Sequence, residues 1–191
     1  MKANNDSKKN VSISSKTISN TPPREDILYE SINKDALVIG DSTRKIISYV
    51  AIKFEPHILF SDFPSDSLLT KPDSVNFMSN PLGKRFKTKI KETVEKEGVN
   101  FGGHYCFVYW GCGAPCQQSV VIDLLTGKIY YGPSAGLGYE FRKNSRMLII
   151  NPPNHYGTDI FHPQPDFYLD CPYCKPEINI WIESKNQFEK R

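Results

Sequence analysis

Residues Asn100–Cys116 read NFGGHYCFVYWGCGAPC and hold three of the five cysteines of the chain, one histidine and four glycines. From His104 to Trp110 the side chains on both alternating sides are largely apolar, which is typical of a strand covered on both faces. Residues Gly111–Cys116 then predict a constrained turn, because glycine permits and proline fixes unusual backbone angles. The stretch therefore predicts a central strand that ends in a tight turn.

Strands are predicted on both sides of this stretch. Gln117–Asp123 follows the turn, and Asp123–Gly127 is a tight reversal in which Gly127 supplies the positive φ of a bulged hairpin. Further apolar or alternating segments predict strands at residues 45–54, 57–60, 128–131, 146–150, 178–183 and 187–190. Together they favour an antiparallel meander or a partly closed sheet.

One main helix is predicted, over Pro81–Glu97. Asn80 is placed to cap it, Pro81 occupies its first turn and Gly98 follows its last turn. Apolar residues recur every four positions and form one stripe that is expected to lie on the sheet: Leu82, Phe86, Ile90 and Val94. With the strands, this helix predicts a single α+β domain over residues 27–191, preceded by a disordered polar leader or tether over residues 1–26.

The predicted helix begins with basic side chains, among them Lys84 and Arg85, and ends with acidic ones. The helix macrodipole favours the opposite order, so a positive helix start with free N–H groups is a candidate anion site. The alternative is an ordinary solvated face with weak ion pairs between successive turns.

The chain has 191 residues and a formal net charge of +3. This charge is too small, and its lysines are too scattered, for the dense basic face of a nucleic-acid-binding protein. No apolar run approaches the roughly 20 residues of a membrane-spanning helix. Charged residues begin the chain without a following apolar segment, so no export signal is predicted in the sequence as written.

Four cysteines form two close pairs, Cys112 with Cys116 and Cys171 with Cys174. Disulfides are one explanation, either within each pair or from one pair to the other, with Cys106 left as a free buried thiol. Zinc is a second explanation, because both spacings let two thiolates reach one tetrahedral ion and the two pairs would complete a four-cysteine site. Disulfides would indicate an oxidising compartment, and zinc would suit a reducing one.

Catalysis is a third explanation for this part of the chain. A Cys/His hydrolase would need the thiolate of Cys112 or Cys116 close to His104, with an acid such as Asp123 to orient the imidazole. His104 begins a strand that is expected to face a core, so a hydrogen-bonded structural histidine is the simpler interpretation. A polar loop further along the chain carries residues that could line a binding site: His155, Tyr156, Asp159 and His162.

The motif GHYxxxxWGCGxxC, at residues 103–116, is accompanied by Asp123-x-x-Thr-Gly-Lys128 and Ser145-Arg-x-Leu-x-Ile-Asn-Pro152. By these residues the chain resembles a family of small exported bacterial proteins to which no activity is attached. The resemblance implies an exported location and a similar architecture, but no reaction. This chain differs from that pattern by the additional pair Cys171 and Cys174 and by the missing export signal.

The leading expectation is a non-catalytic, exported binding protein, periplasmic or extracellular, that is stabilised by its paired cysteines. Its expected partner is a protein or a cell-envelope component, with no nucleic acid, no membrane span and no cofactor unless the cysteines hold zinc. A cytoplasmic location is the alternative. The competing functions are a Cys/His hydrolase that uses the Gly111–Cys116 turn and a structural zinc-binding domain.

Overall fold

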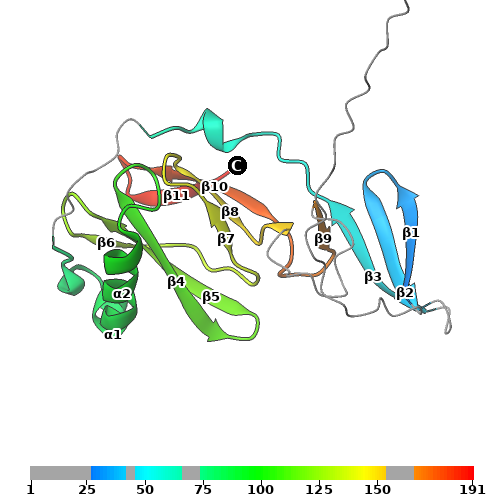
Figure 1. Ribbon diagram of the computed structural model, residues 1–191, viewed down its shortest axis with the longest axis horizontal. Helices are drawn as coiled ribbons and strands as arrows, with labels where there is room; N and C mark the ends of the chain where they lie inside the picture. The colour runs from blue at the N-terminus through cyan, green and yellow to red at the C-terminus, as the bar shows by residue number, and fades with distance from the viewer. Residues whose placement is uncertain (1–26, 42–45, 66–73, 154–165) are drawn as a thin grey trace, which may run out of the picture.

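The computed structural model describes residues 27–41, 46–65, 74–153 and 166–191 (Figure 1). Antiparallel strands predominate, and the helices lie between the third and fourth of them, so the α+β class is confirmed. The elements are β1 (Ile27–Asn33), β2 (Ala36–Asp41), β3 (Ile46–Lys53), η1 (Phe60–Asp62), η2 (Phe77–Ser79), α1 (Pro81–Arg85), α2 (Lys87–Glu97), β4 (Tyr105–Gly113), β5 (Cys116–Asp123), β6 (Ile129–Tyr131), β7 (Tyr139–Phe141), β8 (Met147–Ile150), β9 (Phe167–Leu169), β10 (Glu177–Ile182) and β11 (Gln187–Lys190). The expected leader, residues 1–26, lies outside the described residues.

The described strands divide among three sheets. The N-terminal sheet has the order β1-β2-β3-β9, the hairpin sheet β4-β5-β6 and the closing sheet β11-β10-β8-β7. Figure 1 shows the N-terminal sheet at one end of the molecule and the other two sheets together at the other end. The structure therefore does not show the predicted single meander, because β7, which follows β6 in the chain, pairs with β8 instead of β6.

Both faces of the hairpin sheet are covered. Cys106, Val108 and Trp110 of β4 belong to a core cluster that also contains the apolar stripe of the helices. Tyr105 and Phe107 belong to a second cluster, formed with the closing sheet. The predicted alternation of β4 is confirmed, but its predicted central position is wrong, since β4 is an edge strand and β5 lies between β4 and β6. Side chains thus cover both faces of β4, whereas its outer edge presents backbone N–H and C=O groups.

The predicted helix forms over the expected residues, but in two segments. The Asn80 side chain accepts a hydrogen bond from the Leu82 N–H at 2.8 Å, which caps α1, and Gly98 ends α2 with a φ of 57°. Phe86 leaves helical geometry between the two segments, with a φ of −110° and a ψ of 29°. Its ring stacks on Trp110, with centroids 4.2 Å apart, so the break coincides with a packing contact to the sheet.

The closing sheet covers the other face of the hairpin sheet. The predicted hairpin near the C-terminus is confirmed as β10 and β11, which pair from Asn179 with Lys190 to Ile182 with Gln187. Trp181 of β10 is fully buried and its ring meets those of Tyr105 and Phe188 edge-on, at 5.4 and 5.1 Å. Aromatic rings therefore join the two sheets.

The predicted strand at residues 57–60 is wrong. Pro56 ends the extended segment that follows β3, and residues 60–62 form the short helix η1. The backbone N–H of Leu59 donates to the Asp62 carboxylate at 2.7 Å, and the hydroxyl of Ser145 donates to the carbonyl of Phe60 at 2.7 Å. Side chains thus satisfy the backbone here instead of a neighbouring strand. No helix among the described residues has the length and apolarity needed to cross a membrane.

Replacing Ile90 by alanine tests the packing of the helix on the hairpin sheet. Ile90 is fully buried in the cluster formed with β4 and β5, so the change should lower the free energy of unfolding by about 2–5 kcal/mol. Urea unfolding followed by circular dichroism measures this loss. The exposed neighbour Lys89, replaced by alanine, is the control and should change it by less than about 0.5 kcal/mol. Equal effects of the two substitutions would contradict the packing described here.

Candidate functional site

A disulfide closes the tip of the hairpin formed by β4 and β5. It joins Cys112 to Cys116, whose Cα atoms are 5.1 Å apart, within the usual range for a disulfide. Residues 111–115 are exposed, so the tip projects from the sheet that carries it. Among the pairings that the sequence left open, the structure has the local one.

A second local disulfide joins Cys171 to Cys174, again with Cα atoms 5.1 Å apart. Cys174 is buried, whereas Tyr173 between the two cysteines is 51% exposed. With both pairs oxidised, no thiolate of these four residues is available to a metal ion. Within residues 27–41, 46–65, 74–153 and 166–191, no group of three or more His, Cys, Asp and Glu side chains is arranged to hold a metal.

The two disulfide loops lie at one shallow pocket of about 320 Å³. Pro115 and Cys116 reach it from the hairpin tip, and Tyr173 reaches it from the second loop. The segment between them pairs with the tip, because Gln117 and Ala135 exchange two backbone hydrogen bonds of 2.7 and 3.0 Å. We call this the loop pocket; its lining residues are Pro115, Cys116, Ser134, Ala135, Gly136, Ile150, Asn151, Tyr173 and Glu177.

Asn151 fixes the floor of the loop pocket. Its side-chain oxygen accepts hydrogen bonds of 2.9 Å from the N–H groups of both Gly136 and Leu137. Its side-chain nitrogen donates to the carbonyl of Lys175 at 3.2 Å. The residue has a φ of 52°, a conformation that asparagine tolerates better than most residues. One side chain therefore ties the segment beside the tip to the second disulfide loop.

The close fit of these segments leaves no room for a larger residue at Gly136. A Cβ atom there would lie 2.8 Å from the carbonyl oxygen of Tyr173. At the rim, the carboxylate of Glu177 accepts a hydrogen bond of 2.6 Å from the ammonium of Lys190, so its charge is balanced. The pocket thus presents an exposed phenol ring, a proline and fixed peptide groups.

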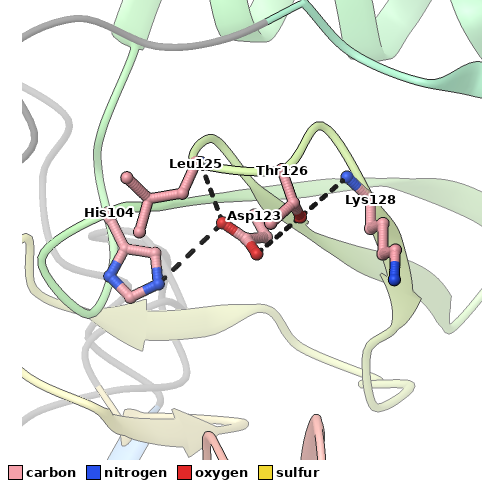
Figure 2. Close-up of polar contacts among 5 residues, drawn as sticks. All are labelled: His104, Asp123, Leu125, Thr126 and Lys128. Carbon is pink, nitrogen blue, oxygen red and sulfur yellow. Dashed lines mark hydrogen bonds and ion pairs between the residues drawn. The ribbon is translucent and has the colours of Figure 1, made fainter.

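His104 and Asp123 form a second candidate site, drawn in Figure 2. The Nε2 atom of His104 lies 3.9 Å from an Asp123 carboxylate oxygen. That carboxylate also accepts hydrogen bonds from the N–H of Leu125 at 2.8 Å and from the hydroxyl of Thr126 at 2.7 Å. The imidazole lies against the ring of Tyr105, with centroids 3.9 Å apart. Asp123 therefore organises the turn after β5, as aspartate does in tight turns, and His104 lies beside that turn.

The structure does not bring the cysteine candidates to this pair. His104 precedes β4, and Cys112 lies eight residues further along the strand, a separation of roughly 26 Å in an extended chain. Both Cys112 and Cys116 are held in a disulfide. The free thiol, Cys106, is fully buried in the cluster beneath the helices, and burial raises its pKa to about 12. The set of His104, Asp123 and a reactive thiolate is therefore not assembled.

Two sets of predicted residues remain, the candidate anion site and the polar loop. Lys84 and Arg85 lie exposed in the last turn of the short helix α1, and the Arg85 guanidinium lies over the Phe86 ring at 5.3 Å. The N–H of Leu82, at the helix start, is already bonded to Asn80. The predicted loop residues lie outside the described residues: His155, Tyr156, Asp159 and His162.

A larger cavity of about 400 Å³ lies beside η1 and the closing sheet, and no sequence pattern pointed to it. Its lining includes Phe60, Met147 and Arg142, and the Arg142 guanidinium lies 4.4 Å from the centre of the Phe60 ring. Pro153 and Asp166 also line it. Because these two residues border a segment outside the described residues, we assign this cavity no role.

Comparison of the chain with protein-family models, with curated proteins and with solved structures found no match. The loop pocket joins segments that are far apart in the sequence, from Pro115 to Glu177, and only its cysteines were marked by a sequence pattern. Tyr173 stood between two of those cysteines, while Gly136 and Asn151 carried no separate signal.

Thiol alkylation tests the cysteine assignment. Protein from an oxidising compartment, unfolded without reductant, should gain one alkyl group, at Cys106, and after reduction it should gain five. The folded protein should gain none, because a pKa of about 12 leaves only about one thiol in ten thousand ionised at pH 8. Intact mass spectrometry measures each state. A gain of five alkyl groups without reduction would contradict the disulfides and would favour the zinc site.

Replacing both Cys112 and Cys116 by serine tests the contribution of the tip. The disulfide closes a loop of sequence separation 4, and the chain-entropy model gives about 2 kcal/mol for such a loop. The free energy of unfolding in urea should fall by about that amount, while far-ultraviolet circular dichroism stays unchanged. An unchanged free energy would show that the tip is held by other contacts.

Proposed function

We propose that the chain is an exported, non-catalytic binding protein and that it binds a partner protein at the loop pocket. The observation that carries this proposal is the convergence of two disulfide loops, from residues 112–116 and 171–174, on one pocket. Loops held on a rigid scaffold are where binding residues concentrate. Two covalent closures and the Asn151 bonds keep this surface in one conformation, which lowers the entropy lost on binding.

The chemistry of the loop pocket suits a polypeptide. Tyr173 offers an exposed ring, 51% accessible, and tyrosine is among the residues that contribute most to protein interfaces. Pro115 and Ala135 line the pocket beside it and offer apolar area. A volume of about 320 Å³ is at the small end for pockets that enclose a free ligand. It is large enough to receive one or two side chains of a partner.

Export is supported by two observations. Disulfides persist in oxidising compartments and are rare in the cytosol, and the chain has two at bonding distance. The motif at residues 103–116 resembles that of exported bacterial proteins. Residues 1–26, polar and rich in Asn, Ser and Lys, would then serve as a tether between the folded part and its point of attachment.

Selection from a random nine-residue peptide library displayed on phage tests the binding function. The bait is the full chain with both disulfides formed, and each enriched peptide is then synthesised and titrated. Replacing Tyr173 by alanine should weaken binding by about 30-fold, as expected for an aromatic anchor. The matched control is Tyr131→Ala, which removes another exposed ring, 60% accessible, outside the loop pocket. That control should leave the affinity within about twofold of the parent chain.

Two results would contradict the proposal. One is a failed selection, in which no peptide is enriched or in which Tyr173→Ala and Tyr131→Ala weaken the binding of the enriched peptides equally. The other is turnover of a panel of ester, peptide and phosphoester substrates that is lost in His104→Ala, since that variant changes the imidazole beside Asp123 and leaves the loop pocket untouched.

A further inference from the structure

Among the described residues, hydrogen bonds from the chain itself reach the outer edge of β4 only at its beginning, at Tyr105 and Phe107. Tyr105 exchanges backbone hydrogen bonds of 3.0 and 3.1 Å with Phe101. At Phe107 the side chain of Asn100 takes the place of a neighbouring strand. Its amide oxygen accepts a hydrogen bond from the Phe107 N–H at 2.6 Å, and its amide nitrogen donates one to the Phe107 carbonyl at 3.1 Å. The N–H and C=O groups of both residues therefore point away from β5.

The same alternation places the next outward groups at Tyr109 and Gly111. Residues that point toward and away from the partner strand alternate along an antiparallel ladder, and the register pairs Tyr109 with Ser119 and Gly111 with Gln117. Ser119 and Gln117 direct their own backbone bonds to Gly132 and Ala135, on the far side of β5. In the part of the chain that the structure describes, no hydrogen bond reaches the outward groups of Tyr109 and Gly111, and both residues are exposed.

Packing among the described residues does not explain why residue 111 is a glycine. Its φ is not in the left-handed region, and a Cβ atom placed on it would meet nothing within 4 Å. Glycine weakens a strand, and in a strand it often marks a place where another backbone comes close. The neighbouring Tyr109 ring is 38% exposed on the same face, and residues 109–113 carry no charge. Charged residues and proline are the usual protection of an edge strand.

We propose that Tyr109 and Gly111 form an open edge that binds an extended strand of a partner protein, so that the partner adds a fourth strand to the hairpin sheet. Main-chain hydrogen bonds give the affinity in this mode of binding, and pockets for alternate side chains give the specificity. The partner residue opposite Gly111 would carry a large apolar side chain, because the missing Cβ leaves room beside the Tyr109 ring. This open edge belongs to β4, whereas the loop pocket lies beside β5, so either site can bind without the other.

A second selection from the nine-residue phage library tests the open edge, with the full-length Tyr173→Ala variant as bait so that the loop pocket is weakened. Gly111→Pro removes the outward N–H and leaves the bonds of β4 to β5 intact. It should weaken the enriched peptides by at least about tenfold. Gly111→Ala keeps the N–H and is the matched control, expected within about threefold of the bait. In ¹⁵N spectra the peptides should slow exchange of the Tyr109 and Gly111 amides.

Gly111→Lys repeats the test if proline unfolds the strand, since its Cβ meets open space and its charge opposes strand addition. The proposal is overturned if no peptide is enriched, or if the enriched peptides bind Gly111→Pro or Gly111→Lys as tightly as the bait. It is also overturned if sedimentation shows a dimer of the parent chain that Gly111→Pro dissociates, because the occupant would then be a second copy. Failure of the loop-pocket proposal would instead appear in the first selection, as enriched peptides whose affinity for the chain is not weakened by Tyr173→Ala.

Discussion

The burial of β4 and β5 on both faces is the constraint on which the rest of the structure depends. Odd and even positions of β4 enter two different clusters, one with the helices and one with the closing sheet. A shift of one residue in register would exchange Phe107 and Val108 between two differently shaped cores, so the register is strongly specified. Packing on both faces therefore fixes the buried length of the hairpin, and the tip is fixed in position with it.

A fixed hairpin allows two binding surfaces beside one tip. On the β5 side, the loop pocket depends on the pairing of Gln117 with Ala135 and on the bonds of Asn151. On the β4 side, the Asn100 side chain bonds the edge at Phe107, and no hydrogen bond from another described residue reaches the outward groups of Tyr109 and Gly111. Both surfaces lie beside strands that are buried on two faces, and a site supported by rigid strands holds its geometry.

Local patterns in the sequence predicted the main helix and most of the strands, but they did not predict β1, β2, β7 or β9. They also did not predict which strands pair over long range. The alternation of residues 104–110, the Asn80 cap and the Gly98 stop were all visible, because each depends on neighbours in the chain. The division into three sheets was not, since nothing local says that β7 pairs with β8. The cysteine spacings marked two parts of the loop pocket, but Gly136 and Asn151 join it only through contacts with distant residues. The role of Asn100 was hidden for the same reason, because it depends on the direction of the Phe107 backbone groups.

Native-state hydrogen exchange along β4 tests the central claim most directly. The amides of Cys106, Val108 and Trp110 face β5, and those of Tyr105 and Phe107 are bonded to Phe101 and Asn100. All five should exchange at least about 1,000-fold more slowly than the amides of Tyr109 and Gly111. This pattern would establish a hairpin that is fixed on both faces and open at one edge. Protection of Tyr109 and Gly111 equal to that of Val108 in the free protein would contradict it.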